Sequence, residues 1–339
     1  MAAQADINDL RSAWRALSGT VGSEGWKTIS VASPAPCMLL AGRRLPGDQE
    51  ALLVGFHNIS TPPDSQLPQG HGFEVSRLSA DPLGGDRLWL SLTRRPGGSP
   101  ELFAMMAEDL LRLIEESNAQ DEEQLLHGFF SRIRAWQDFM DRHREGMLSP
   151  EAELGLFGEL VIIDRMIAAD MPERHVIESW QGPLDGLQDF VPGSGGIEVK
   201  ATLSAGGFPA TISSLEQLDD NLRQPLFLAA VRLALDPSGM TLPAKAEEVR
   251  KRLRGNPAAL DLFDVRLMQA GFLRTMSERY TRRLLPISTG VLPVQETFPR
   301  LTRAHVHPAI RKARYEIDLD LAGVADIGLA RALELLGAI

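Results

Sequence analysis

The chain has 339 residues, of which 44% are hydrophobic and 24% are charged, a balance that is typical of a soluble protein with a buried core and excludes a disordered or fibrous chain. The formal net charge of -10 disfavours a nucleic-acid partner, yet the segment 241–315 holds fifteen Lys and Arg against six Asp and Glu. That basic segment is either a nucleic-acid footprint or a solvated helix face.

Targeting signals and thiol chemistry are not expected. No stretch approaches the roughly 18 uncharged apolar residues of a membrane span, and Asp6, Asp9 and Arg11 stand where a signal peptide needs an apolar run. A cytoplasmic protein is therefore predicted. The single cysteine, Cys37, cannot form an internal disulfide or a zinc cluster, and we interpret it as a small buried hydrophobe.

The first half of the chain predicts a β-rich domain followed by helices. Residues 1–100 contain short apolar runs, such as MLLAG, ALLVGF and RLWLSL, that are separated by Gly- and Pro-rich turns, and they predict an N-terminal β-rich domain. Residues 101–148 keep apolar side chains at spacings of three and four and predict a helical connector.

The second half predicts a mixed α/β core and a helical end. Within residues 149–235, Ser149 before Pro150 marks a helix start, and this helix should continue to about Ala169. Strands are predicted at HVIESW, QDFV, GIEVKATL and PLFLAAVRLAL, and a Ser-capped short helix at SSLEQLDDNL. Residues 236–339 predict a basic, mainly helical C-terminal region with helices in AKAEEVRKRLRG, AALDLFDVRLMQAGF and ADIGLARALELLG.

The most informative stretch is QDFVPGSGGIEVKAT at residues 188–202. Its Gly-rich turn between two apolar runs predicts a hairpin, in whose second strand Glu198 and Lys200 point to one face. An isolated Glu-x-Lys is most often part of an ordinary amphipathic strand with its polar face in solvent.

Three observations favour a reactive site over that ordinary strand. The hairpin can bring Asp189 beside Glu198, and two adjacent carboxylates are costly unless a cation lies between them. Lys200 is one of only five lysines in a chain with 30 arginines, and an ammonium is a compact charge suited to a reacting phosphate. Glu159, on the helix that begins after Ser149, offers a third carboxylate.

These residues resemble the PD-(D/E)XK nuclease core, in which an acid-bearing helix precedes a sheet that carries an Asp and then a Glu-x-Lys. The blocks ELGLFGEL, SWQGPLDGLQDF, GIEVKATL and TISSLEQL resemble a family of bacterial PD-(D/E)XK proteins of uncharacterised activity found near restriction-type phage-defence genes. The resemblance covers about residues 149–235. It implies a restriction-endonuclease-like α/β fold and a Mg²⁺ or Mn²⁺ site whose ligands come from Asp189, Glu198, the Val199 carbonyl and Glu159, with Lys200 as the catalytic lysine.

Some features of this site stay open. Gln188 stands where the motif has its proline, and Asp185 is an alternative first metal ligand. Gln217 is a candidate substrate contact, although a capping box with Ser213 or Ser214 explains the same residue. No phosphate-binding loop or dinucleotide fingerprint is present.

The resemblance implies a Mg²⁺-dependent endodeoxyribonuclease of a restriction or phage-defence system. Its expected partners are DNA, other proteins of a defence complex and a second copy of the chain, because two cuts in a duplex need two sites. The alternative is a catalytically silent nuclease-fold subunit that binds DNA or assembles a complex. The sequence does not distinguish DNA from RNA as the substrate, nor single strands from double strands.

Overall fold

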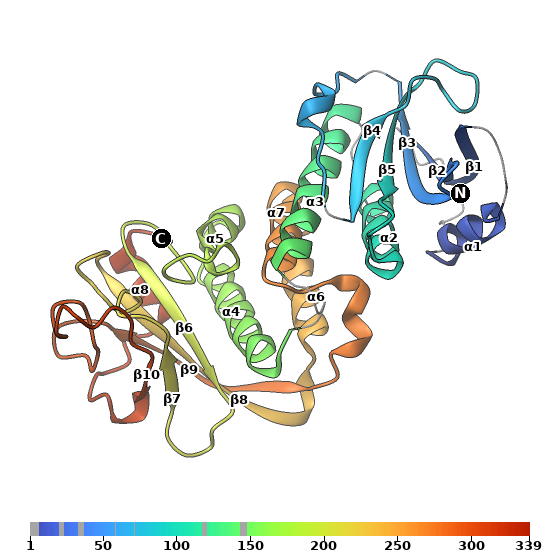
Figure 1. Cartoon of the computed structure of the whole chain (residues 1–339). Helices are drawn as coiled ribbons and strands as arrows, with labels where there is room; N and C mark the ends of the chain where they lie inside the picture. Colours follow the sequence, from blue (N-terminus) through green and yellow to red (C-terminus); the bar gives the residue numbers. More distant parts are fainter. Residues whose placement is uncertain are drawn as a thin grey trace. The chain divides into compact units, whose positions relative to one another are not determined.

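The computed structural model describes residues 7–19, 24–32, 37–57, 59–70, 72–116, 121–142 and 148–339. Asp6, which entered the prediction about targeting, and the side chain of Asp9 lie outside the described part. The chain divides into two compact units, residues 1–144 and 145–339, and each is described by itself (Figure 1).

The N-terminal unit is built on a five-stranded antiparallel sheet with the order β1-β2-β3-β5-β4. The middle strand β3 is buried from Ala51 to Phe56, and it lies between β2 and β5, so neither of its edges is free. The elements are β1 (Gly25–Ala32), β2 (Met38–Leu45), β3 (Gln49–Phe56), β4 (Phe73–Arg77), β5 (Leu88–Arg94), α1 (Ile7–Leu17), α2 (Pro100–Glu116), α3 (Glu122–Arg142) and the short 3-10 helix η1 (Asp64–Gln66).

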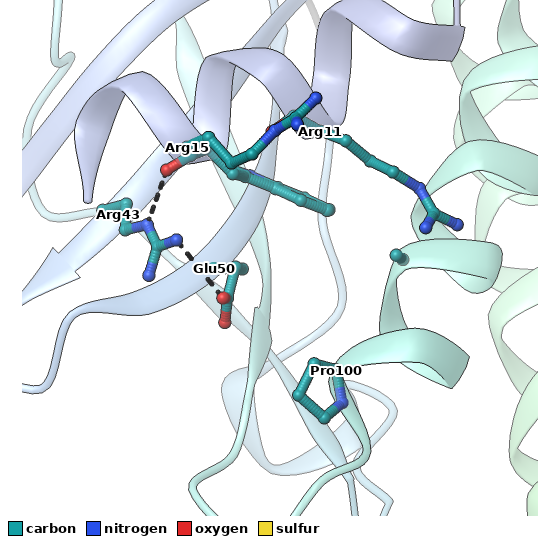
Figure 2. A pocket seen from close by; sticks show the side chains of 7 residues that line it. Arg11, Arg15, Arg43, Glu50 and Pro100 are labelled. Carbon is teal, nitrogen blue, oxygen red and sulfur yellow. Dashed lines mark hydrogen bonds and ion pairs between the residues drawn. The ribbon is translucent and has the colours of Figure 1, made fainter.

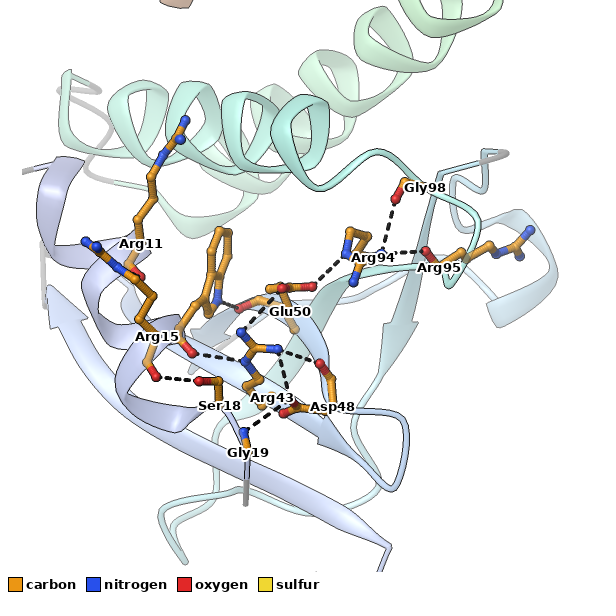
Figure 3. A network of polar contacts seen from close by, with 12 residues as sticks. Arg11, Arg15, Ser18, Gly19, Arg43, Asp48, Glu50, Arg94, Arg95 and Gly98 are labelled. Atoms are coloured by element: carbon orange, nitrogen blue, oxygen red, sulfur yellow. Dashed lines mark hydrogen bonds and ion pairs between the residues drawn. The ribbon is translucent and has the colours of Figure 1, made fainter. Parts of the chain in front are cut away.

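A polar network ties α1 to this sheet (Figure 3). Trp14 donates its indole N–H to the Ala51 carbonyl at 2.8 Å, and the Arg43 guanidinium donates to the Trp14 carbonyl at 3.0 Å. Arg43 also pairs with Asp48 and with Glu50, each at 3.3 Å. The buried arginine is thus paired with carboxylates, so its charge is compensated inside the unit.

The C-terminal unit contains two small sheets. In the first, β6 (Gly196–Thr202) runs parallel to β8 (Leu226–Met240), and β8 pairs antiparallel with β9 (Leu284–Pro293). In the second, β7 (Pro209–Ile212) pairs antiparallel with β10 (Tyr315–Asp318). The second sheet packs through Ile212 and its neighbours into a core cluster that also contains residues of β8 and β9.

Helix α4 lies along β6, and α8 contacts β9 (Figure 1). The Oγ of Ser149 accepts a hydrogen bond from the Ala152 N–H at 3.2 Å, which confirms the predicted helix start at Pro150. The helical elements are α4 (Pro150–Ala168), α5 (Glu173–Ser179), α6 (Leu242–Leu253), α7 (Pro257–Gln269), α8 (Leu329–Leu336) and the 3-10 helices η2 (Gly182–Leu184), η3 (Arg274–Arg279) and η4 (Leu319–Leu321).

Three predicted elements differ from those in the structure. HVIESW, predicted as a strand, belongs to helix α5, where Val176 and Ile177 are buried on its inner face. SSLEQLDDNL, predicted as a helix, forms turns, because Gln217 and the acids around it bond to neighbouring segments instead of continuing a helical ladder. QDFV, predicted as a strand, forms only isolated antiparallel bridges, in which Phe190 pairs with Trp180 and with Ile197.

The four segments distinguished in the sequence are grouped differently in the structure. Residues 101–142 fold in one unit with the N-terminal sheet, and the predicted boundary at 235 falls inside β8. Strands β9 and β10 come from the segment 236–339, and each completes a sheet begun in the segment 149–235. Pairing over long sequence separations, which composition does not reveal, causes this regrouping.

Two smaller expectations have structural counterparts. Cys37 is buried, and burial raises the pKa of its thiol to about 12, so the side chain stays protonated and behaves as an apolar group. Among the helices of the described residues, none has the length and apolar character needed to cross a bilayer.

Candidate active site

Helix α4 brings Glu159 to strand β6. The preceding residue, Gly158, lies so close to the strand that a Cβ there would stand 2.9 Å from the Ala201 Cβ, so glycine allows the helix to approach. The Glu159 carboxylate then accepts a hydrogen bond from the buried Trp180 indole N–H at 2.6 Å. The orientation of Glu159 is therefore fixed by a side chain that is itself fixed by packing.

Asp189 approaches β6 from the edge that β8 does not cover. Phe190 exchanges two backbone hydrogen bonds with Ile197, at 3.0 and 2.8 Å, which sets the pairing of this short hairpin. Two residues further along, the Val199 N–H donates to Asp189 Oδ2 at 2.7 Å. The N–H and C=O of one strand residue point to the same edge, so the Val199 carbonyl also faces the side of Asp189.

Glu159 and Asp189 lie on either side of one glycine. A Cβ on Gly182 would stand 2.7 Å from Glu159 Oε2 and 3.0 Å from Asp189 Oδ1. The Gly182 N–H also donates to the Asp189 carbonyl at 3.0 Å. A side chain at this position would occupy the space beside both carboxylates, so Gly182 keeps that space open.

Strand β6 supplies the glutamate and the lysine of the motif. Glu198 is only 2% exposed, and its Oε1 lies 2.8 Å from the Lys200 Nζ. The same oxygen accepts a hydrogen bond from the Gln217 amide, whose own oxygen accepts from the Ser213 N–H at 2.9 Å. The polar face of β6 is therefore buried against partners and is not the solvent-exposed face of an ordinary amphipathic strand.

Burial raises the pKa of all three carboxyls, and the charge of Asp189 adds to the shift at Glu159 and Glu198. Burial, then the charge of Asp189, raises the pKa of Glu159 to about 8. Burial, then the charge of Asp189, raises the pKa of Glu198 well above its ordinary value, against the opposing pull of Lys200. Burial also raises the pKa of Asp189, although the Val199 N–H and Lys200 counteract it. Three acids share one ammonium, so the cluster has an excess of negative charge when it is ionised.

A divalent cation fits this arrangement. Glu198 Oε2 is buried and has no hydrogen-bond partner among the described residues, while Oε1 has two. Leaving a buried carboxylate oxygen unpaired is costly, and a hard cation with oxygen ligands would satisfy it. Within the described residues, however, no three Asp, Glu, His or Cys side chains are positioned together as a metal-binding group. The donors would accordingly be two carboxylates and the Val199 carbonyl rather than three side chains.

Asp185 and Gln188, the other residues considered near the motif, differ in exposure: Asp185 is at the surface and Gln188 is buried. Asp185 is exposed, in a left-handed conformation at the end of η2, whereas Asp189 bonds to β6. This contrast favours Asp189 as the acid of the motif. Gln188, at the position of the motif's proline, is buried, and its amide lies 3.5 Å from the Gln217 carbonyl.

Sequence reasoning missed two neighbours of the site. Trp180 is buried against Phe263, and its indole N–H also holds Glu159. Tyr315 lies close enough to Lys200 for that ammonium to lower its pKa in part, although burial dominates and raises it. No local signal marks either residue, because each meets the site only through the fold.

A hollow lies in the N-terminal unit (Figure 2). It has a volume of about 350 Å³, and the lining includes cationic side chains of α1 and β2. Arg11 is paired with Glu108, and Arg43 with Asp48 and Glu50, so these two cations are neutralised by the unit's own acids. The lining residues are Arg11, Trp14, Arg15, Arg43, Glu50, Pro100 and Ala104.

Comparison with known proteins gives one match. The model of a protein family, DUF4420, described as "Putative PD-(D/E)XK family member", matches residues 10–320. Neither the curated proteins nor the solved structures contain a match to this chain. The family match spans both units and includes every residue of the candidate site.

Proposed function

The chain belongs to the DUF4420 family of PD-(D/E)XK proteins, and from this membership we propose that it is a metal-dependent nuclease that hydrolyses DNA phosphodiester bonds. The fold is nuclease-like, and a mixed α/β unit holds the acids and the lysine of the motif. One observation carries the proposal: Glu198 is buried and binds Lys200 through one oxygen, and its other oxygen has no hydrogen-bond partner in the part of the chain that the structure describes.

In this proposal Asp189, Glu198 and the Val199 carbonyl hold Mg²⁺ or Mn²⁺, and Glu159 supports the site directly or through water. A bound divalent ion supplies positive charge for the phosphoryl oxygens and lowers the pKa of an attacking water. Lys200 has a 16% exposed side chain, so its ammonium can face the substrate while it remains bonded to Glu198. It would stabilise the negative charge that develops on the phosphate and orient the water.

Gln217 is proposed as a positioning residue. Its amide links the Ser213 N–H to the Glu198 carboxylate, so it holds the carboxylate in one orientation. The same amide group lies within the segment that connects β7 to β8, where a substrate strand could contact it. The capping box considered in the sequence does not form, because no helix begins at Ser213 or Ser214.

The proposal includes a role in restriction-like phage defence, which the family resemblance implies. The sequence has no nucleotide-binding loop, so energy and site selection would come from partner proteins. A second copy of the chain would supply the second cut in a duplex.

A catalytically silent nuclease-fold subunit is the second candidate function. It is favoured by one observation, that the described residues contain no group of three acidic or other metal-binding side chains. Such a subunit would bind DNA without cleaving it, and Glu159 would remain protonated near neutral pH, as its raised pKa allows.

The deciding experiment is incubation of the purified protein with supercoiled plasmid and with single-stranded DNA in Mg²⁺ or Mn²⁺. We expect cleavage that EDTA abolishes and that Lys200→Ala and Asp189→Asn each reduce by about 10²- to 10⁴-fold. Lys251→Ala, which removes an exposed lysine of α6, should retain full activity. Equal activity in wild type and Lys200→Ala would remove this lysine from the mechanism, and binding without any cleavage would support the silent subunit.

A further inference from the structure

A strongly basic loop connects β9 to β10 beside the candidate site. Between Thr297 and Arg314 it contains five basic residues and no acidic one, in a chain whose net charge is -10. The charge of this loop is therefore opposite in sign to the net charge of the whole chain. The basic residues are Arg300, Arg303, Arg311, Lys312 and Arg314.

The first part of the loop is anchored to the segment that carries Gln217. Arg300 donates to the Leu218 carbonyl at 2.9 Å and pairs with Asp220 at 2.8 Å. Arg303 pairs with Glu216 at 2.7 Å. These ion pairs lie on both sides of Gln217 in the sequence, so the loop is fixed next to the residue that bonds to Glu198.

The loop is also folded upon itself and closed at its far end. The Arg303 guanidinium donates to the Ile310 and Arg311 carbonyls at 3.2 and 3.0 Å. The Tyr315 hydroxyl accepts from the Leu301 N–H at 3.0 Å, and the charge of Lys200 reaches this hydroxyl. The backbone of the loop is therefore held in place at the side of the site where Lys200 lies.

The last three basic side chains have no such structural role. Arg311, Lys312 and Arg314 are exposed, and no acid of the described residues pairs with any of them. Arg300 and Arg303 hold the loop, whereas these three cations are presented to solvent on a fixed backbone. A fixed group of unpaired cations is the usual means by which proteins bind phosphates without reading sequence.

We propose that Arg311, Lys312 and Arg314 bind the phosphate backbone of DNA and hold the strand across the site at Glu198 and Lys200. This inference rests on the proposed function for its substrate, but it concerns binding rather than cleavage. The contacts are to phosphates, so they determine affinity and register and contribute no sequence preference. They also explain how an acidic protein binds a polyanion, since the local charge of the loop is positive.

The test measures binding of a short fluorescent DNA duplex by fluorescence anisotropy at several salt concentrations, in Mg²⁺ and with Lys200→Ala in every protein to prevent cleavage. The triple variant Arg311→Ala, Lys312→Ala, Arg314→Ala should bind about 10- to 100-fold more weakly at low salt, and its salt slope should fall by about 3. The charge-conserving variant Arg311→Lys, Arg314→Lys should stay near the parent protein.

A matched control removes three cations elsewhere in the same unit, at Lys251, Arg254 and Arg279, and should leave affinity and salt slope nearly unchanged. Equal binding by the parent and the loop variant, or no binding by any of the proteins, would overturn the inference. If binding depends on the loop but the wild-type protein does not cleave DNA in the plasmid assay, the inference is supported and only the proposed nuclease activity is contradicted.

Discussion

The N-terminal unit and the cluster at Lys200 in the C-terminal unit differ in how their buried charges are paired. Among the described residues of the N-terminal unit, the buried charged residues Arg43, Glu108, Asp109 and Arg132 each have an oppositely charged partner. In that cluster the buried carboxyls of Glu159, Asp189 and Glu198 all interact with one ammonium, that of Lys200, and Glu198 Oε2 has no hydrogen-bond partner among the described residues. Paired charges stabilise a fold, whereas unbalanced ones lower stability unless a ligand compensates them, so the imbalance marks the candidate site.

Breaking a pair in the N-terminal unit should give the largest loss of stability. Asp109 lies 3.2 Å from the Arg132 guanidinium and accepts the Trp136 indole N–H at 2.9 Å. Asp109→Ala would leave the buried arginine without this counter-charge, at a cost of about 3–5 kcal/mol. Urea unfolding monitored by tryptophan fluorescence measures this loss in the free energy of unfolding. A loss below about 1 kcal/mol would show that the pair is not a main support of the unit.

Removing a charge from the C-terminal cluster should raise stability at high pH instead of lowering it. A carboxyl whose pKa rises on folding adds stability that is complete below its unfolded value and is lost as the pH rises through its folded value. For Glu159 this window extends from 4.5 to about 8. In EDTA, the melting temperature of the wild type should therefore fall between pH 5 and pH 9, and Glu159→Gln should reduce that fall.

At pH 9 the Glu159→Gln variant should be more stable than the wild type by about 2 kcal/mol, while its nuclease activity is reduced. Mg²⁺ should raise the melting temperature of the wild type most at high pH, because the ion competes with protons for the carboxylates. Parallel pH curves for the two proteins would contradict the imbalance attributed to this cluster.

Two buried tryptophans allow the finest comparison. Trp180 donates to Glu159 in the candidate site, and Trp136 donates to Asp109 in the N-terminal unit. Substitution of either by Phe keeps a ring and removes the N–H, which should cost about 1–2 kcal/mol in thermal unfolding. Only Trp180→Phe should raise the Mg²⁺ concentration needed for half-maximal cleavage. An equal rise in this Mg²⁺ concentration for Trp136→Phe would mean that the effect comes from a general loss of stability and not from the contact with Glu159.

Local patterns predicted a large part of this fold. Capping at Ser149, the apolar spacing of α6 and α7 and the continuous apolar run of β8 each depend on residues close together in the chain, and the structure has these elements. The sequence HVIESW was predicted wrongly as a strand. Its β-branched residues also pack well on a short helix, and here α5 buries them in contact with α7. Its state is decided by tertiary contact and not by propensity.

The amino-acid sequence by itself determined which groups are available for the candidate site: a Glu-x-Lys after a Gly-rich turn, an Asp before it and a Glu on the preceding helix. It also determined the concentration of basic residues near the end of the chain. Only the tertiary structure decided that Glu198 is buried rather than solvated, that Trp180 holds Glu159 and that the basic loop is attached beside Gln217. Burial and partner choice depend on segments far apart in the chain, and the energy of a charge depends on both.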